Sequence, residues 1–437
     1  MKAGQSRIRL FLVFWLFILS GVAFFDRSNI TVAGVAMSKE FGIDRVHLGW
    51  LFSAFLIGYA GFQVPAGWLS VRFGPRKTLG LALVWWCVFS AATTLASPAF
   101  GNVLLQLLLL RFVLGLGESL MYPSANQFFA YWIPKQERAK ATGWLFAGVG
   151  VGSGFTPPLV TWLMLTYGWR ASFWFAAVIG VIAAAVWYAM ARDRPEQHPG
   201  VAAGELAHIT AGAAREVNTG KNPAPWGAIF ASRSVWMLSL AYFAFGYIAY
   251  IFLSWFFIYL ADAHGLDLKK SALYAVLPFI SLTVCCLLGG VISDWLVRTR
   301  NPFTGRCIFP SVALLACGLF LFLGSRTDDP LLATIILAGG VGALYLTQSS
   351  YFAVAADMAG GHTGILAGWI NTFNQIAGAI TASATPWLAG QYGWASAFYV
   401  AAGFAVIGAL AWLTVDPETV LAEAGHPLNS LAETVVE

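Results

Sequence analysis

Long runs of apolar residues, separated by short polar segments, dominate the pattern along the chain. A run of about 20 such residues crosses the hydrocarbon core of a bilayer as one α-helix. The sequence therefore predicts an all-α polytopic membrane protein with twelve transmembrane helices. We place them at residues 10–36, 47–70, 77–97, 103–131, 139–165, 171–191, 234–260, 271–296, 307–325, 331–356, 364–389 and 394–415.

A polar segment divides these helices into two sets of six. We predict an N-terminal six-helix bundle over residues 1–191, a cytoplasmic central loop over 192–233, a C-terminal six-helix bundle over 234–415 and a cytoplasmic tail over 416–437. The central segment is read as a loop because it is rich in proline and charged residues.

Short motifs repeat between the two halves. Gly143-Trp144 recurs 225 residues later as Gly368-Trp369, and Gly168-Trp169 recurs at the same spacing as Gly393-Trp394. Two related six-helix halves are typical of transporters, because rocking one half against the other exposes a central site to each side in turn. We therefore expect two pseudo-symmetric bundles.

Lysine and arginine predict the orientation of the helices. With the N-terminus inside, 17 of the 25 basic residues lie in cytoplasmic segments, six lie outside and two, Arg27 and Arg111, lie within helices. Cytoplasmic loops carry the excess of Lys and Arg. Both termini are therefore expected in the cytoplasm, and the protein is expected in the inner membrane of a bacterial cell.

The amino-acid composition mainly excludes several classes of protein. Hydrophobic residues make up 59% of the chain and charged residues only 10%, against roughly 25% charged residues in a soluble domain. A soluble enzyme, a nucleic-acid-binding protein and a secreted disulfide scaffold are therefore excluded. The net charge of +5 requires no acidic partner, because loop arginines account for it.

The cysteines do not predict a metal or cofactor site. They are five in number, lie within apolar runs, and have neither metal-ligand spacing nor the pattern of a disulfide framework. We therefore interpret them as small hydrophobic core residues: Cys87, Cys285, Cys286, Cys307 and Cys317.

Four ionisable residues fall inside predicted helices: Asp26 and Arg27 in the first, Arg111 and Glu118 in the fourth. An ionised side chain at the centre of a bilayer costs at least about 2.5–3.5 kcal/mol, so such residues normally face a cavity. Asp26 and Arg27 are adjacent, so their side chains diverge by roughly 100° around the helix. A structural ion pair that holds helices together is the alternative.

Together the four residues predict coupling between an anion and a proton. Two arginines and two carboxylates sum to zero charge, so a bound organic anion leaves one negative charge without compensation. Protonation of Asp26 or Glu118 restores neutrality. Arginine suits the anion because its planar guanidinium binds a carboxylate through two hydrogen bonds.

Further polar residues on apolar helices are expected to line the same cavity, although interhelical hydrogen bonds are an equal alternative. The substrate-binding residues expected beside Arg27 and Arg111 are Tyr59, Gln348, Asn371 and Asn374. Other polar residues that could line the cavity are Gln63, Tyr122, Asn126, Tyr345, Ser349 and Gln375, of which Gln375 shares a helix face with Asn371 and Asn374. The turn after the second helix and its second copy predict a cytoplasmic gate made of Gly67, Arg72, Gly74, Arg76 and Asp294.

Over residues 8–415 the sequence resembles the major facilitator superfamily and, within it, the anion:cation symporter family. The resemblance rests on Phe25-Asp26-Arg27-Ser28-Asn29-Ile30, on Arg111 with Glu118 seven residues later, and on Trp132-Ile133-Pro134. It implies a monomeric carrier of a small organic anion such as a sugar acid, a dicarboxylate or an aromatic acid. It also implies substrate binding by Arg27 and protonation of Asp26 and Glu118, with Arg111 and Tyr59 matching family positions.

Three positions depart from the family pattern. Val71 replaces an aspartate in the first inside loop, Phe24 replaces a tyrosine common in sugar-acid carriers, and Phe257 replaces a proline. The second departure favours a sparsely hydroxylated acid over a hexonate. Exchange of one anion for another stays open beside proton symport, and a polytopic membrane enzyme or a sensor is the alternative from another class.

Overall fold

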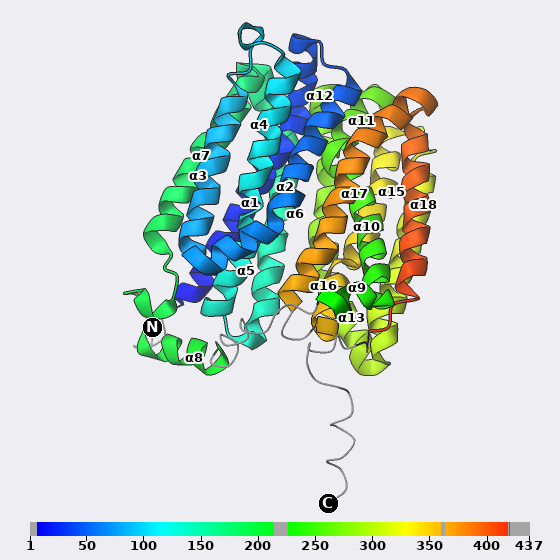
Figure 1. Ribbon diagram of the computed structural model, residues 1–437. Coiled ribbons are helices and arrows are strands. Elements are labelled where there is room, and N and C mark those ends of the chain that lie inside the picture. Colours follow the sequence, from blue (N-terminus) through cyan, green and yellow to red (C-terminus); the bar gives the residue numbers. More distant parts are fainter. Residues whose placement is uncertain (1–6, 214–225, 360–362, 418, 420–437) are drawn as a thin grey trace, which may run out of the picture.

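The computed structural model describes residues 7–213, 226–359, 363–417 and 419. All regular elements in these ranges are helices, which confirms the predicted all-α class. Figure 1 shows the helices as two groups side by side, the N-terminal group in blue to cyan-green and the C-terminal group in green to red.

The first group contains the six predicted N-terminal spans. A break at Ser119 and Leu120 divides the fourth span into two helices. The helices are α1 (Ile8–Phe41), α2 (Arg45–Phe73), α3 (Pro75–Thr93), α4 (Val103–Glu118), α5 (Met121–Trp132), α6 (Lys135–Tyr167) and α7 (Trp169–Met190).

The second group contains the other six spans, three of which are also divided by short breaks. They comprise α10 (Arg233–Ser254) with α11 (Phe256–His264), α12 (Leu268–Tyr274) with α13 (Val276–Thr299), α14 (Phe309–Gly324), α15 (Pro330–Leu346) with α16 (Gln348–Ala359), α17 (Thr363–Tyr392) and α18 (Trp394–Trp412). A π-helical turn, Thr304–Ile308, precedes α14.

Length and apolar composition agree with a multi-pass arrangement. In the part of the chain that the structure describes, eight spans are by themselves long and apolar enough to cross a membrane. The helix α2, bent by 52° between Gln63 and Pro65, is a ninth when its two halves are counted as one span. The spans α3, α6 and α17 complete the predicted twelve. Basic, glycine and amide residues interrupt their apolar sequences. The spans α6 and α17 pack against helices of both groups, whereas α3 packs against α2, α4, α5 and α7 of the first group.

The segment predicted as a central loop contains helices that the sequence analysis did not predict. Residues 192–233 include α8 (Ala203–Ala213) and α9 (Trp226–Ala231), while residues 214–225 lie outside the described part. Glu205 of α8 accepts hydrogen bonds from the backbone N–H groups of Ile8 and Arg9 at 3.2 and 3.1 Å. This contact with a distant helix start was not visible in the local sequence. The division of the chain at residues 191, 233 and 415 stays a prediction.

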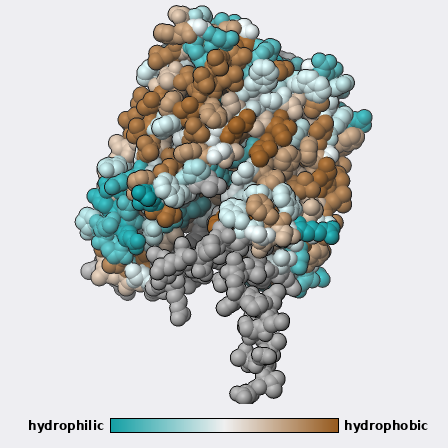
Figure 2. Space-filling view, in the orientation of Figure 1, coloured by the Kyte–Doolittle hydropathy of each residue, from teal (hydrophilic) through white to brown (hydrophobic). Residues whose placement is uncertain are grey.

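The two groups meet along α2 with α17 and along α6 with α13. We call the end of the molecule where α8 and α9 lie the lower end, and the end where α11 and α12 lie the upper end (Figure 1). At the upper end Arg45 Nη2 lies 2.9 Å from Asp262 Oδ1, and the rings of Phe52 and Trp255 are 5.2 Å apart. Figure 2 shows the surface recessed between the groups toward the lower end. The structure is therefore closed at the upper end.

A glycine and a proline allow α2 and α17 to approach closely near the upper end. A Cβ atom at Gly49 would lie 2.4 Å from the carbonyl oxygen of Ala382, so only glycine fits there. Pro386 has no N–H to donate to that carbonyl. Trp255 Nε1, from the residue between α10 and α11, donates to it instead at 3.0 Å. The contact thereby joins α2, α17 and the junction of α10 with α11 at one backbone position.

Candidate functional site

The first helix directs two adjacent charged side chains to different neighbours, as their spacing predicts. Asp26 Oδ1 accepts a hydrogen bond from Ser90 Oγ of α3 at 2.5 Å. Arg27 Nε and Nη2 both donate to Glu118 Oε1 of α4, at 3.0 and 2.7 Å. Asp26 is 2% exposed and Glu118 1% exposed, so both carboxyl groups are removed from solvent.

Aromatic rings surround the Arg27 guanidinium. Its central carbon lies 4.5 Å from the ring centre of Phe24, 5.0 Å from that of Phe55 and 4.7 Å from that of Tyr59. A guanidinium within about 6 Å of a ring face is attracted by the ring quadrupole. Tyr59, predicted near the substrate, therefore lies directly beside Arg27.

Arg111 lies on the other side of Phe55 and is 2% exposed. Its central guanidinium carbon is 4.8 Å from the Phe55 ring centre, and its Nε and Nη1 atoms have no hydrogen-bond partner among the described residues. The second oxygens of Asp26 and Glu118 are likewise without partners in that part of the chain. Buried charged groups normally have partners, so this cluster is suited to receive a further polar group.

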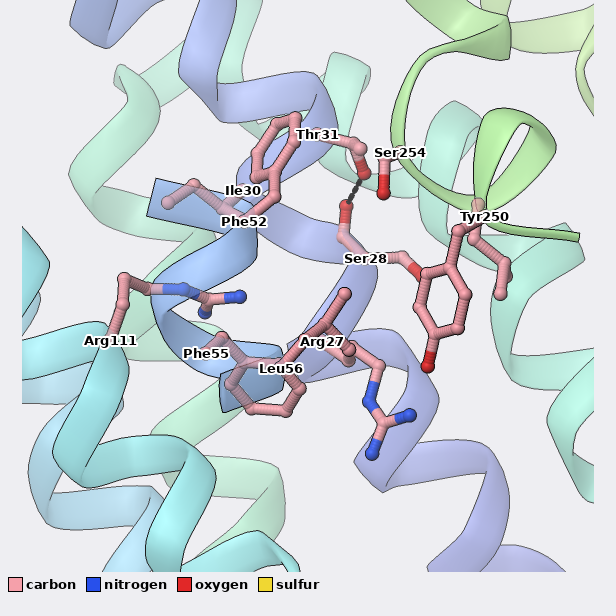
Figure 3. A pocket seen from close by; sticks show the side chains of 11 residues that line it. Arg27, Ser28, Ile30, Thr31, Phe52, Phe55, Leu56, Arg111, Tyr250 and Ser254 are labelled. Atoms are coloured by element: carbon pink, nitrogen blue, oxygen red, sulfur yellow. Dashed lines mark hydrogen bonds between the residues drawn. The ribbon is translucent and has the colours of Figure 1, made fainter. Parts of the chain in front are cut away.

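A small cavity of about 20 Å³ lies between the two arginines (Figure 3). The first group lines it with both arginines, Phe52, Phe55 and Ser28, and α10 adds Tyr250 and Ser254 from the second group. Figure 3 shows Arg111 reaching toward it from α4, with Phe55 between the two arginines. A volume of this size holds roughly one water molecule. The cavity is therefore too small for an organic anion in this conformation.

The polar candidates of the second half lie elsewhere in this conformation. Gln348 Nε2 donates to Tyr242 OH at 3.0 Å, and its Oε1 has no partner among the described residues. Asn371 Nδ2 donates to Gln63 Oε1 at 3.0 Å and so joins the two groups. Asn374 is buried, with its backbone packed against Gly246 of α10. None of the three lines the small cavity.

The other polar candidates also lie outside the small cavity, and most of them have partners of their own. Tyr122 OH pairs with Ser20 Oγ at 3.0 Å, and Gln375 Oε1 accepts from Tyr250 OH at 2.6 Å. Tyr345 packs on Phe245 with ring centres 5.1 Å apart. Asn126 is exposed, and Ser349 is half-buried.

The predicted gate residues gather at the lower ends of the helices. Gly74 has φ +86, in the region that favours glycine, and the backbone N–H of Arg76 donates to Asp193 Oδ1 at 2.9 Å. The guanidinium of Arg72 lies over the rings of Trp68 and Phe73 at the end of its own helix, and Gly67 faces open space.

The second copy of the gate motif does form ion pairs. Arg306 Nη1 lies 3.0 Å from Asp294 Oδ1, and Arg306 Nε lies 3.5 Å from Asp357 Oδ2. Val71 stands at the corresponding position of the first copy and carries no charge.

Sequence reasoning missed two residues beside this cluster. Ser90 donates to Asp26, and Tyr250 lines the cavity between the arginines. A serine on an apolar helix gives no signal of its own, and Tyr250 lies in an aromatic run where it resembles a core residue. In the described ranges, no three His, Cys, Asp or Glu side chains are grouped to hold a metal ion, and all five cysteines are unbridged.

Comparison with solved structures identifies the fold. The chain is similar to a D-xylose-proton symporter, with a TM-score of 0.72, 14% identity, and coverage of 94% of this chain and 98% of that one. It is also similar to a bacterial homologue of the human lysosomal transporter Spinster in an inward-facing and occupied conformation. There the TM-score is 0.73 with 18% identity, over 94% of this chain and 97% of that one.

Comparison of sequences identifies the family. The model of the Major Facilitator Superfamily matches residues 16–382 and 311–432. A probable sulfoacetate transporter of Cupriavidus necator is 33% identical over 399 residues, 91% of each chain. A hexuronate transporter of Bacillus subtilis is 29% identical over 417 residues, 93% of this chain and 94% of that one. The chain is therefore a multi-pass membrane transporter of the major facilitator superfamily, related to organic-acid transporters, and not an enzyme.

Proposed function

We propose that this protein is a proton-coupled symporter that imports a small organic anion. The observation that carries the proposal is Arg111, a buried arginine beside a cavity, two of whose nitrogen atoms have no partner among the described residues, while the nearby Arg27 is already paired. A buried charge without a partner is costly in free energy. An anionic group that pairs with Arg111 removes this cost, which favours its binding. The names of the organic-acid relatives support the same substrate class.

The charge balance of the site is the reason to expect that a proton binds together with the anion. Arg27, Arg111, Asp26 and Glu118 together carry no net charge when all are ionised. An added anion leaves a buried negative charge, whose desolvation is costly unless it is neutralised. Asp26 and Glu118 each have an oxygen without a partner among the described residues, so each has a place for a proton.

Access is proposed to alternate between the two sides of an inner membrane. The lower end, where α8 and the basic loops lie, is assigned to the cytoplasm by the excess of Lys and Arg. The Arg45–Asp262 ion pair at the upper end then closes the outward path, and the recess in Figure 2 is the inward path. Import requires the upper contacts to open and the lower ends to approach.

The substrate is proposed to be a small, sparsely hydroxylated carboxylate or related acid. Phe24, Phe52 and Phe55 surround the arginines with ring surfaces that offer no hydrogen bonds. A sugar hydroxyl left unpaired in such a site costs about 1–3 kcal/mol. Competition of uptake by galactonate, benzoate-type acids and short dicarboxylates tests this. Stronger inhibition by galactonate than by the others would overturn the substrate preference and leave the symporter unaffected.

Purified protein in liposomes tests the coupling. The liposomes carry either an inward proton gradient or a load of unlabelled anion inside. A symporter accumulates labelled anion with the gradient alone, and a protonophore abolishes the accumulation. Uptake that requires the internal anion and ignores the gradient would instead identify an exchanger.

A further inference from the structure

A second cavity lies on the outside of the molecule, between α2 and α17. Its volume is about 510 Å³, and its walls include Leu56, Ile57 and Gly61 on one side and Ile376 and Ile380 on the other. Ile57 is 56% exposed and Ile380 46% exposed, so the groove opens outward. Figure 1 shows both helices at the front of the molecule, between the two groups. We call this cavity the α2–α17 groove.

The polar side chains in the groove are already engaged. Ser53 Oγ donates to the carbonyl oxygen of Ala379 at 2.6 Å. Because a hydroxyl has one hydrogen to donate, Ser53 Oγ then accepts in its 2.7 Å hydrogen bond with Ser383 Oγ. Thr372 Oγ1 donates to its own helix, and Gln375 Oε1 accepts from Tyr250. What the groove offers to an occupant is therefore mainly apolar surface.

The groove lies near the middle of two helices that cross the membrane, at the height where the surroundings are hydrocarbon. An empty space on such a surface loses the dispersion contacts of its walls. Water would find few free hydrogen-bonding groups there. Large apolar side chains that border the groove are exposed on the outer surface: Ile57, Ile376 and Ile380. We propose that the α2–α17 groove is the binding site of one acyl chain of a bilayer lipid.

The two helices are built to stay apart at this height. At the upper end of the groove they are joined by Ser53 and Ser383, which line it, and below the groove Asn371 donates to Gln63 at 3.0 Å. Just below that contact α2 bends by 52° at Pro65. The helices are thus held at both ends of the groove, and the space between is retained.

The groove is separated from the arginine cavity by a single layer of side chains. Leu56 lines both cavities. Tyr250 lines the inner cavity and hydrogen-bonds Gln375, which lines the groove. An acyl chain in the groove therefore packs against side chains that also form a wall of the arginine cavity.

The test uses the full-length protein in nanodiscs made with a phosphatidylcholine that carries a diazirine in the middle of one acyl chain. Illumination cross-links the chain to its neighbours, and mass spectrometry locates the adducts. Gly61→Leu fills the groove, because a Cβ at Gly61 meets no atom within 4 Å. Gly403→Leu on α18 is the control, since Gly403 is also exposed and equally open.

We expect adducts concentrated on residues 53–61 and 372–383 in the wild type and in Gly403→Leu, and their loss in Gly61→Leu. Ala60→Leu is a second groove-filling variant if Gly61→Leu does not fold. Adducts spread evenly over all lipid-facing helices, or unchanged in both groove variants, would overturn the proposal. Adducts displaced by added organic acid would assign the groove to the substrate and overturn it too. The readout does not depend on transport, so it stands apart from the proposed symport.

Discussion

Arg27 donates both Nε and Nη2 to a single oxygen of Glu118, Oε1, at 3.0 and 2.7 Å, while Oε2 has no partner in the described part of the chain. A fork-to-fork pair would occupy both oxygens. The observed pair leaves one oxygen of the carboxylate available to a proton or to a rearranged arginine. The contact joins residues 91 positions apart and fixes α1 against α4.

Replacing Arg27 by lysine keeps the charge but removes the planar fork. We expect Arg27→Lys to lower the uptake rate by at least about tenfold, because breaking a buried charge pair costs about 3–5 kcal/mol and lysine cannot reproduce the geometry. Uptake per reconstituted molecule is the measurement, with the amount of protein in the membrane as the control. Wild-type kinetics in Arg27→Ala would contradict the role of Arg27.

Neutral variants of the two carboxylates separate exchange from accumulation. Glu118→Gln mimics the protonated side chain, so we expect it to exchange internal for external anion but to lose accumulation driven by a pH gradient. Counterflow and gradient-driven uptake are measured on the same liposomes. Asp26→Asn is the matched variant, and normal accumulation in Glu118→Gln combined with its loss in Asp26→Asn would assign the coupling to Asp26.

A methyl group at Gly49 is expected to force α2 and α17 apart. Its Cβ would lie 2.4 Å from the Ala382 oxygen, an overpacking that costs about 1–3 kcal/mol. Gly49→Ala should therefore lower the melting temperature and increase labelling of the upper end by impermeant reagents. Gly390→Ala on α17 is the control: its Cβ meets no atom within 4 Å, and alanine favours a helix by roughly 0.5–1 kcal/mol. Equal melting temperatures in the two variants would refute the close contact.

Glu137, before the predicted span of α6, gives a pH dependence of stability. The hydrogen bond from Arg9, together with one from His208, lowers the pKa of the Glu137 carboxyl group. A lowered pKa in the folded state contributes stability above the pKa of the unfolded chain, and that contribution is lost as pH falls through the folded value. For a partly exposed pair it is at most about 1 kcal/mol.

We therefore expect the melting temperature of Glu137→Gln to fall less than that of the wild type when the pH is lowered from about 7 to below the ordinary glutamate pKa of about 4.3. Glu196→Gln, an exposed carboxylate in the same region, should follow the wild type. Parallel curves for wild type and Glu137→Gln would show that the cluster with Arg9 does not contribute.

The sequence by itself determined the properties that depend on local composition. The length and apolarity of each run predict the spans, and the 100° step between neighbours predicts that Asp26 and Arg27 face different helices. The charged residues of the cluster are visible because ionised groups are rare in apolar helices. The breaks at Ser119 and Trp255 and the helix α8 were not predicted. Trp255 donates to Ala382 of α17 and Glu205 of α8 accepts from the start of α1, and the local sequence does not show such distant contacts.

The tertiary structure alone decided which groups meet. The pairing of Arg27 with Glu118 instead of Asp26, the donation from Ser90 to Asp26, and the approach of Tyr250 from the other half depend on how helices rotate and cross. Crossing is set by side-chain packing and by close contacts such as Gly49 on Ala382. Hydrophobicity places a helix in the membrane, but most spans here are apolar enough to be placed by it. Hydrophobicity therefore says little about which helices are neighbours. Which helices become neighbours is determined by the packing of their side chains, and this packing exists only in the folded chain.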